Sequence, residues 1–527
     1  MGKEIGIDLG TTNTVVSYMN KNGKLRQLRY DGKEIIPSVI YFRSESEYFI
    51  GEAAQKYFNN NPAAGIKNFK TTIGNSERHE IIPEVGKPFY KRSREIAQLF
   101  LNKIVVGMEN KLIKEFGAID GCIDRAVITV PANFSSTEKG ATKNAARSAG
   151  LSDVKLAAEP TAAAIAYEDS QGDENSRSVI LVYDFGGGTF DVSIIQKNNG
   201  AFEEITTNGD KHLGGNILTN ILAEEILSRV NEDYGVEFPF AEDEFDEDYH
   251  GISLSEYRQN MNEIWRVANL IKEDLSESND VIENFNIYLP NDKSELVTVD
   301  FSRDELEEYI KDSIERTVEI TLKEIQRAKD LGFNKIDQIV LAGGSSNIPL
   351  VKERLEECLQ NQDVVFCDDV STLISRGAAV LAQRYAQIDS LSKAVTNVQM
   401  GVAATQGVHF ERFQMIIPED EPLPCAKKKI FYLSQDNQKK LEIEYYERDI
   451  KNFPNAVRVD DEGIEQIDSL IIDNLPPNLK AAETLVEVEF IAQKDGSLDI
   501  NVELKDRNGK KISSGNMNYK KKSDLLE

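Results

Sequence analysis

The sequence contains little cysteine, little positive charge and no long hydrophobic run. Its 4 cysteines, Cys122, Cys358, Cys367 and Cys425, stand singly without a CxxC pair, which indicates reduced thiols in a cytoplasmic protein rather than a disulfide framework or a zinc site. Lys and Arg number 61 against 89 Asp and Glu, a net charge of −28, so binding to nucleic acid or to an anionic membrane is not expected. No apolar run approaches the ~20 residues of a membrane helix, and Met1 leads directly into a strand-like segment, so we expect no signal peptide.

The rest of the composition is that of an ordinary globular protein. The chain has 527 residues, of which 40% are hydrophobic and 28% charged. These values exclude wholesale disorder and a small stapled scaffold. At ~150 residues per domain, the length predicts two to four domains.

Two segments far apart in the chain share one pattern. In each, an apolar strand runs into Asp, one apolar residue and Gly, and a second strand begins after Thr: IGIDLGTTNTVVSYM (Ile5–Met19) and VILVYDFGGGTFDVSII (Val179–Ile195). We therefore expect two β-hairpins with glycine-containing turns. This pattern excludes a P-loop and a Rossmann finger, which both need a helix after the glycines. Two such turns predict a pair of related lobes that face one cleft.

The segments around these hairpins alternate between strand and helix, which is typical of α/β folds. Ser135 and Glu138 stand at capping-box spacing after a turn at Pro131, and Glu159 precedes Pro160, as in the first turn of a helix. The acidic stretch 241–248 is expected to be a solvated loop. The other expected elements are strands at 126–130 and 339–342, helices at 217–230 and 254–275, and a helix with Pro349 in its first turn.

Beyond about Ala386 the pattern changes to strict alternation of apolar and polar residues. It is cleanest at Leu498, Ile500, Val502 and Leu504, and predicts an all-β module of the size of one sandwich. Turns are expected at 435–437, 494–496 and 507–509. The polar segment 520–527 ends the chain, and Leu526-Glu527 could be a cloning remnant, in which case the natural protein continues.

The glycine-containing turns can bind phosphate, because backbone N–H groups approach an anion closely where no Cβ interferes. The candidates are Gly10, Thr11 and Thr12 in the first turn and Gly186, Gly187, Gly188 and Thr189 in the second. Asp8 and Asp184 stand at the mouths of these turns, where two carboxylates can hold Mg²⁺ through its water shell. A third turn, Gly343-Gly344-Ser345, precedes a helix N-terminus and, together with the hairpins, predicts an adenosine site.

The segments GIDLGTTNTVV, TVPANF, EPTAAAIAY, DFGGGTFDVSI, HLGGN and VLAGGSSNIP, in this order, resemble the DnaK-type seventy-kilodalton heat-shock chaperones. The resemblance extends from residue 5 to about 515. It implies a multidomain fold: a two-lobed, actin-like α/β nucleotide-binding domain (1–386), a linker (387–396) and an all-β sandwich that binds peptide (397–527). It also implies ATP or ADP with Mg²⁺ as cofactors.

The resemblance assigns a role to each motif residue. Lys70 matches the lysine beside the γ-phosphate, Glu159 the water-orienting glutamate, and Pro131 the proline that couples the cleft to the linker. Asp184 and Thr189 complete the expected catalytic set, with Asp191 alongside. Little here activates a nucleophile strongly, so we expect slow hydrolysis that depends on charge neutralisation and an aligned water. The remaining expected nucleotide contacts are Asp8, Gly10, Thr11, Thr12, Asn13, Gly186, Gly187, Gly188, Gly214, Gly215, Lys272, Ser276, Gly343, Gly344 and Ser345.

Two departures from the family pattern affect the expected function. Glu273 and Asn347 occupy the positions where a basic residue and an arginine commonly sandwich the adenine, and Asn269 replaces an acid that contacts the ribose. Neither Glu273 nor Asn347 can stack on the base as a guanidinium does. We therefore expect a lower affinity for adenine, or a base that is held differently. Family linkers carry an acid, a run of leucines and a second acid, whereas the matching segment 389–394 retains one leucine and lacks the second acid. Lys155 stands where the family usually has an arginine. We therefore expect weak or rewired interdomain coupling.

In the β module, an apolar slot beside strand edges would bind an extended hydrophobic segment. Individual positions such as Phe431 and Ile443 fit an ordinary sandwich core equally well. No pattern of a helical lid follows residue 520, so we expect fast release of peptide from a lidless or truncated member. The expected peptide contacts are Val402, Thr405, Phe431, Ser434, Leu441 and Ile443.

We interpret the sequence as an ATP-dependent chaperone that binds unfolded or extended polypeptides, with a J-domain co-chaperone and a nucleotide exchange factor as further expected partners. One alternative is a paralogue in which nucleotide is structural and the β module holds or recruits a client without cycling. A second is a sugar kinase or a filament-forming actin relative, which shares the hairpins but leaves the β module unexplained. An ATP turnover assay with and without peptide separates the first two interpretations.

Overall fold

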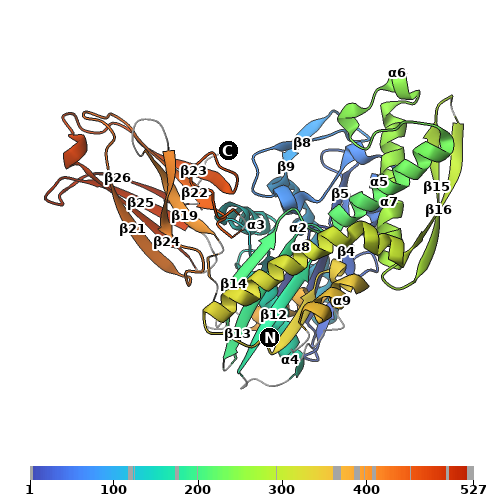
Figure 1. Ribbon diagram of the computed structural model, residues 1–527, viewed down its shortest axis with the longest axis horizontal. Helices are drawn as coiled ribbons and strands as arrows, with labels where there is room; N and C mark the ends of the chain where they lie inside the picture. Colours follow the sequence, from blue (N-terminus) through green and yellow to red (C-terminus); the bar gives the residue numbers. More distant parts are fainter. Residues whose placement is uncertain are drawn as a thin grey trace.

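The computed structural model describes residues 4–116, 123, 125–171, 177–198, 200–291, 293–359, 370–384, 392–393, 395–396, 398–405, 411–451, 453–493 and 498–518. Figure 1 shows two α/β lobes on the right and a β-sandwich on the left. The predicted combination of a two-lobed actin-like part and an all-β sandwich is confirmed. The division at residues 386 and 396 stays a prediction.

The first lobe is built on a mixed sheet with the strand order β11-β10-β1-β2-β3, in which β4 also pairs with β2. β1 and β2 form the predicted hairpin, with Leu9 opposite Thr14. β10 runs parallel to β1 and to β11. The strands are β1 (Glu4–Leu9), β2 (Asn13–Met19), β3 (Leu25–Gln27), β4 (Ile35–Pro37), β10 (Arg125–Val130) and β11 (Val154–Ala158).

The second lobe repeats this plan in the order β17-β12-β13-β14-β18. β12 and β13 form the second predicted hairpin, with Phe185 opposite Phe190, and β17 runs parallel to β12. The strands are β12 (Arg177–Phe185), β13 (Phe190–Asn198), β14 (Ala201–Asp210), β17 (Gln338–Ala342) and β18 (Ser392–Lys393).

Two helices lie between the sheets of the lobes. α4 (Glu159–Gln171) and α10 (Leu373–Gln383) pack on each other, α10 also against β1 and α4 against β12. A Cβ on Gly377 would overlap the backbone carbonyl of Ala162, so glycine is required where the two helix backbones meet. Alanine, leucine, isoleucine and valine side chains from α4, α10, β12 and β17 form a common buried cluster here. This cluster joins the lobes at their base.

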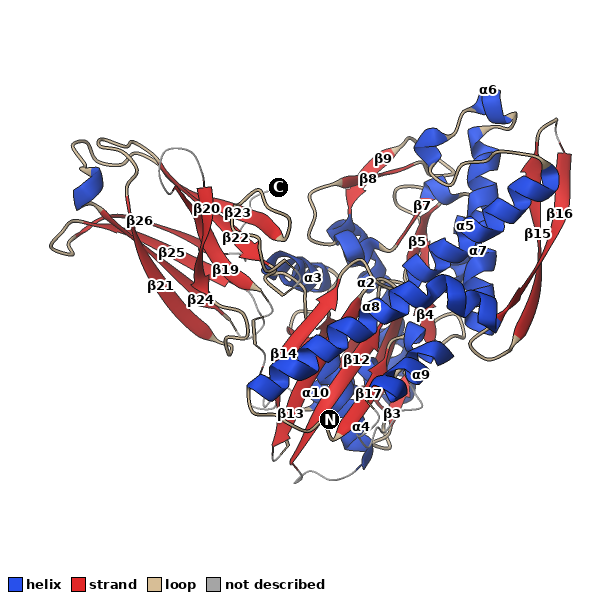
Figure 2. Ribbon diagram, viewed as in Figure 1, coloured by secondary structure: helices blue, strands red, loops and turns tan. Residues whose placement is uncertain are grey.

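The outer helices cover the second sheet and the upper part of each lobe (Figure 2). The sequence defines several of them by capping boxes: Ser135 with Glu138, Ser253 with Glu256, and Ser302 with Glu305. The helices are α1 (Gly51–Asn60), α2 (Ser93–Phe116), α3 (Ser136–Ser148), α5 (Gly215–Tyr234), α6 (Glu247–His250), α7 (Leu254–Asp274), α8 (Arg303–Asp330) and α9 (Pro349–Cys358). The upper strands are β5 (Val39–Phe42), β6 (Tyr48–Ile50), β7 (Gly65–Lys67), β8 (Arg78–Ile81), β9 (Phe89–Arg92), β15 (Asp280–Leu289) and β16 (Lys293–Ser302).

Most of the expected elements occur where the sequence predicts them. The acidic stretch 241–248 is the exception, since it contains a 3₁₀ turn at Glu242–Glu244 and the start of α6 instead of an irregular loop. The turn is stabilised by Arg258, which forms two hydrogen bonds with the Glu242 carboxylate, and Asp246 caps α6 through the Tyr249 backbone. The stretch remains solvated, as predicted.

The upper parts of the lobes also touch each other. Lys67 on β7 places its ammonium 3.7 Å from the ring centroid of Trp265 on α7, and the indole N–H donates to Asn220 at 2.9 Å. Trp265 is the single tryptophan of the chain. This cation–π contact joins the first lobe to the second above the cleft between them.

The sandwich consists of one sheet with the order β20-β19-β22-β23 and another with the order β21-β24-β25-β26. Leu498, Ile500, Val502 and Leu504 are all buried between them, as the alternation predicts. The predicted turns at 435–437 and 507–509 connect strands, while 494–496 lies outside the described residues. The strands are β19 (Gln399–Thr405), β20 (Glu411–Ile417), β21 (Cys425–Tyr432), β22 (Leu441–Arg448), β23 (Ile464–Ile472), β24 (Leu485–Ala492), β25 (Leu498–Lys505) and β26 (Lys511–Asn518).

The sandwich docks on the second lobe beside β14 (Figure 1). β18, from the segment before the sandwich, runs parallel to β14. Lys451 of the sandwich donates to the backbone carbonyl of Thr207 on β14. Its ammonium also lies 2.9 Å from the Asp420 carboxylate, and the Lys451 side chain is only 3% exposed.

Asp420 continues this contact to α8. It pairs with Arg327, whose guanidinium also lies 3.2 Å from the fully buried Glu324 carboxylate. We call Glu324, Arg327, Asp420 and Lys451 the interdomain ion cluster. The second lobe contributes Glu324 and Arg327, and the sandwich contributes Asp420 and Lys451. Docking therefore brings the cation of each domain close to a carboxylate of the other domain.

Candidate functional site

The two predicted glycine turns meet face to face. A Cβ on Gly187 would overlap the hydroxyl of Thr12, and a Cβ on Gly188 would lie 2.7 Å from the Thr11 hydroxyl oxygen. Glycine is therefore required in the second turn so that it can approach the first. The first turn is itself held by Ser38, whose hydroxyl donates to the Gly10 carbonyl at 2.8 Å and whose N–H donates to the Thr12 carbonyl at 2.8 Å.

Three aspartates surround this point. Asp8 stands near the end of β1 and accepts a hydrogen bond from Thr129 at 3.2 Å. Asp184 and Asp191 lie opposite each other across the β12–β13 hairpin, and both are buried. The Thr189 hydroxyl donates to Asp191 at 3.2 Å. The fold therefore places Asp8 and Asp184 near the mouths of the two turns, with Asp191 beside Asp184.

Lys70 and Glu159 form a buried ion pair beside these aspartates. Their Nζ and Oε1 atoms are 2.6 Å apart, and both side chains are less than a tenth exposed. Lys70 lies in a 3₁₀ turn, Phe69–Thr72, of the first lobe, and Glu159 is the first residue of α4. The ring of Phe134 lies 5.7 Å below the ammonium.

The carboxylates hold protons more tightly than usual. Burial, followed by the charge of Glu159, raises the pKa of Asp8 to about 7 and that of Asp191 to about 8. The same causes raise the pKa of Asp184 well above its ordinary value. Burial acts to lower the pKa of Lys70, but Glu159 and Asp8 raise it overall. The cluster therefore carries more negative charge than one lysine balances, which favours a bound cation.

The site fits Mg²⁺ held through water. Within the described part of the chain, no three Asp, Glu, His or Cys side chains converge closely enough to bind a metal directly. Buried polar atoms without a hydrogen-bond partner among the described residues include Thr12 Oγ1, which faces Gly187 of the second turn, and both amide atoms of Asn133, whose backbone N–H hydrogen-bonds the Asp191 carboxyl. Hydrated Mg²⁺ with phosphate oxygens supplies the donors and acceptors that such atoms need.

The other end of the cleft carries the expected nucleoside contacts. Gly215 N–H donates to the Gly186 carbonyl at 2.9 Å, and Ser345 donates to the same carbonyl at 3.0 Å. The ammonium of Lys272 donates to the Gly215 carbonyl at 3.0 Å and to Thr219 at 2.7 Å, and burial lowers its pKa to about 8. Gly214, Gly215, Lys272, Gly343 and Ser345 are thus brought together, with Ser276 one turn along, donating to the Lys272 carbonyl at 3.2 Å.

The two adenine-binding positions that differ from the family pattern, Glu273 and Asn347, lie at this end of the cleft and are exposed. Glu273 accepts a hydrogen bond from Asn269 at 2.8 Å, and Asn347 donates to the Gly344 carbonyl at 3.1 Å. Both side chains are solvent-accessible. The surroundings contain a carboxylate and an amide where the family pattern has cations.

The expected peptide contacts are divided between core and surface. Val402 and Leu441 are buried in the sandwich core, while Phe431 and Ile443 pack partly against it. Ser434 is exposed and donates to Gln438 at 3.1 Å. Thr405 ends β19, and its side chain lies outside the described residues, as do positions 389–391 and 394 of the linker.

The sequence analysis missed three residues of this site. Ser38 and Thr129 support the first turn and Asp8, and Asn133 lies beside Asp191. Asn133 is in the motif TVPANF, and its place after a buried strand and Pro131 was the available signal. Ser38 and Thr129 lie in ordinary strand sequence, which gives no indication of their hydrogen bonds.

The raised pKa of Asp191 predicts a stability that depends on pH. The folded state binds the Asp191 proton with a pKa near 8 instead of 3.8, so the free energy of unfolding of the nucleotide-free protein falls as pH rises from about 4 to about 8. We expect Asp191→Asn to reduce this slope in thermal unfolding between pH 6 and 8 and to raise stability at pH 8. The matched variant Asp243→Asn, at an exposed acid, should leave the slope as it is. An unchanged slope in Asp191→Asn contradicts the assignment.

None of the helices within the described residues combines the length and apolar character needed to cross a bilayer. A family model described as Hsp70 protein matches residues 4–525. Among curated proteins, the chaperone protein DnaK of Thermotoga neapolitana is 32% identical over 452 residues, which cover 84% of this chain and 70% of the relative. These similarities give no support to the sugar-kinase and actin interpretation.

Proposed function

This chain belongs to the Hsp70 family of chaperones, whose members are ATPases, and we propose that it hydrolyses ATP slowly in the cleft between its lobes and binds extended polypeptide in its sandwich. The observation that carries the proposal is the buried Lys70–Glu159 pair amid three aspartates, between two facing glycine turns. The comparisons give no support to a paralogue that holds nucleotide without turnover.

Residues of this chain account for the binding of ATP and for the rate of its hydrolysis. ATP with Mg²⁺ supplies the γ-phosphoryl group and much of the charge neutralisation. Backbone N–H groups of the two turns, with the Thr11, Thr12 and Thr189 hydroxyls, donate to phosphate oxygens. The Lys70 ammonium stabilises the charge that develops on the transferring group. Glu159 and Asp184 accept hydrogen bonds from the attacking water and orient it. Hydrolysis then depends on charge neutralisation and an aligned water, and we propose that turnover is slow.

The sandwich supplies the client site. Phe431, Ser434 and Ile443 retain exposed area, whereas Val402 and Leu441 are buried in the sandwich core. An extended hydrophobic segment would bind here through its backbone and one buried side chain. We propose unfolded polypeptides as clients, with a J-domain protein and an exchange factor as further partners.

A single-turnover experiment tests this proposal. Radiolabelled ATP is bound in excess protein, and the conversion to ADP is followed with and without an unfolded hydrophobic peptide. Slow hydrolysis with magnesium supports an ATPase, and a change in rate with peptide supports coupling between the cleft and the sandwich. Bound ATP that stays intact for hours favours the non-cycling alternative. Hydrolysis that never responds to peptide contradicts the coupling.

We expect Glu273→Arg to tighten ATP binding. A guanidinium at this exposed position can stack on the adenine, a cation–π interaction of about 0.5–2 kcal/mol, whereas the present carboxylate offers no such contact. The dissociation constant for ATP, measured by calorimetry, should fall about two- to 30-fold. Glu277→Arg makes the same charge change just beyond the helix and should have a much smaller effect. A nanomolar dissociation constant for the natural chain would contradict the proposed weak adenine site.

A further inference from the structure

The short 3₁₀ turn that carries Lys70 is held against helix α2 at both of its ends. At its start, the buried ring of Phe69 packs on that of Phe100 in α2, with 5.4 Å between the ring centroids. At its end, the Thr72 hydroxyl forms a hydrogen bond of 2.7 Å with the hydroxyl of Ser93, the first residue of α2. Ser93 and Phe100 are seven residues apart, so they lie on one face of the helix, two turns from each other.

The Ser93 hydroxyl links α2 to two other segments. The start of the helix is capped by the Glu95 carboxylate, which accepts from the Arg92 N–H at 2.7 Å, so the Ser93 hydroxyl is available for contacts outside the helix. Its side chain is buried, and its oxygen lies 2.7 Å from both Thr72 Oγ1 and His79 Nε2. A hydroxyl has one donor and two acceptor sites, so these two hydrogen bonds fix its rotation.

His79 is at the far end of this group of three side chains. It lies on β8 opposite Lys91 of β9, and β9 continues directly into Ser93 at the start of α2. The hairpin therefore keeps the imidazole within reach of the Ser93 hydroxyl. When Nε2 is the unprotonated nitrogen, Ser93 donates to His79 and accepts from Thr72, so each side chain has a partner. We call Thr72, Ser93 and His79 the Ser93 bridge.

Lys70 depends on the position of its turn. Its ammonium lies 2.6 Å from the Glu159 carboxylate and 5.7 Å from the ring centroid of Phe134, and both of these residues belong to other segments of the fold. A shift of the turn would therefore move the ammonium relative to its partners and to the phosphate. Misplacement of a reacting group by ~1 Å can cost ~100-fold in rate, so the contacts that hold the turn affect the reaction.

We propose that Thr72 and Ser93, with the Ser93 hydroxyl oriented by His79, are positioning residues that hold the Lys70 ammonium in place for ATP hydrolysis. The inference rests on the proposed function. The Ser93 bridge fixes the end of the turn against α2, while Phe69 fixes its start. The bridge neither contacts the nucleotide nor transfers a proton to it. It therefore acts on the chemical step, whereas the affinity for ATP comes from the glycine turns.

Thr72→Val removes the hydroxyl and keeps the shape of the side chain. Well below the unfolding transition, the single-turnover rate of ATP hydrolysis should fall about tenfold, while the dissociation constant of ATP changes less than about threefold. Thr72→Ser retains the hydroxyl and should keep most of the rate. Thr71→Val is the matched control in the same turn: the Thr71 hydroxyl is exposed and donates to the Asn68 carbonyl at 2.9 Å, where water can replace it, so the rate should stay near that of the natural chain.

Two double variants show whether the effect passes through Lys70. In Lys70→Met the ammonium is absent, so the addition of Thr72→Val should slow hydrolysis less than about twofold further, because residues that act as a unit are not additive. A general disturbance of the fold would instead slow both backgrounds by the same factor. His79→Phe lacks the imidazole nitrogen and should also slow hydrolysis, and the addition of Thr72→Val to it should cost less than in the natural chain.

The outcomes separate this inference from the proposed function. If the natural chain does not hydrolyse ATP, the proposed function is wrong and the inferred role is wrong with it. If the natural chain hydrolyses ATP and Thr72→Val does so at the same rate, the inference is wrong and the ATPase stands. An equal loss from Thr72→Val in the natural and the Lys70→Met backgrounds also overturns the inference, as does a loss of ATP affinity as large as the loss of rate. If Thr72→Val does not fold, His79→Phe, at the partly exposed end of the bridge, decides by the same comparisons.

Discussion

Lys70→Met should reduce single-turnover ATP hydrolysis by about 100- to 1,000-fold. A well-placed donor to a developing negative charge contributes about 3–4 kcal/mol, and each 1.4 kcal/mol is a factor of ten in rate. Lys70 is the ammonium that lies within the three-aspartate cluster, 2.6 Å from Glu159, so its charge cannot be replaced by a neighbouring residue of that cluster. ATP binding should weaken much less, because the two glycine turns remain.

The same substitution should destabilise the nucleotide-free protein at neutral pH. Without Lys70, the Glu159 carboxylate stays buried and unpaired among Asp8 and Asp184, and removal of one partner of a buried pair costs about 3–5 kcal/mol. The double variant Lys70→Met/Glu159→Gln removes both charges, so it should regain stability without regaining activity. Lys56→Met, at an exposed lysine on α1, is the control. Hydrolysis at the natural rate in Lys70→Met would disprove the assigned role.

Lys451→Met should release the sandwich from the second lobe. The substitution removes the hydrogen bond to the Thr207 carbonyl and leaves Asp420 with Arg327 alone. The Lys451 charge also no longer offsets the burial that raises the pKa of Glu324. Breaking one partner of a buried ionic network costs about 3 kcal/mol or more, so the ratio of docked to separated molecules should fall about 100-fold.

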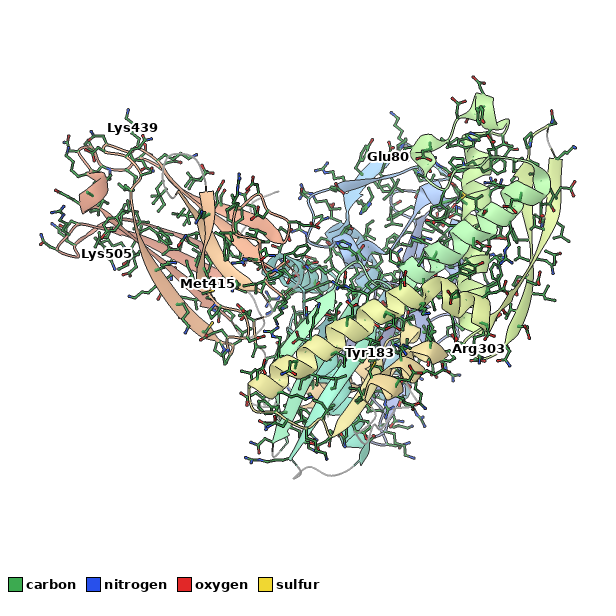
Figure 3. The ribbon with its side chains drawn as sticks, in the orientation of Figure 1. Glu80, Tyr183, Arg303, Met415, Lys439 and Lys505 are labelled. Carbon is green, nitrogen blue, oxygen red and sulfur yellow. The ribbon has the colours of Figure 1, made fainter. Side chains whose placement is uncertain are left out.

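Small-angle X-ray scattering measures this release as an increase in the radius of gyration, and proteolysis in the linker should become faster. Lys439→Met is the matched control, because Lys439 lies at the end of the sandwich away from the lobes (Figure 3) and its side chain is exposed. If scattering and cleavage are the same for both variants, the interdomain ion cluster does not hold the domains together. If peptide no longer changes the hydrolysis rate in Lys451→Met, the cluster also carries the coupling.

The elements that were predictable share a local cause. The two hairpins follow from Asp and Gly between alternating strands, and α3 follows from Ser135 and Glu138, whose side chains satisfy the free N–H groups of the first turn. Sequence motifs indicated four charged residues of the candidate site, and the structure brings them together: Lys70, Glu159, Asp8 and Asp184. Their roles were implied by resemblance and stay proposals.

The residues that were missed depend on contacts distant in sequence. Asn133 meets Gly209 and Asp191 only after two lobes have folded, and Lys451 meets Thr207 only after the sandwich has docked. The linker pattern predicted weak or rewired coupling because one leucine remained. The ion cluster supplies a contact that no local pattern in the linker could indicate, since its members come from α8, the loop after β20 and the loop after β22.

Trp265 gives this protein an internal optical probe. Because it is the single indole in the chain and a lysine from the opposite lobe lies over its ring, its emission reports the distance between the upper halves of the molecule without any attached dye. The opening and closing that must accompany the entry and exit of a ligand are therefore observable in the unmodified chain.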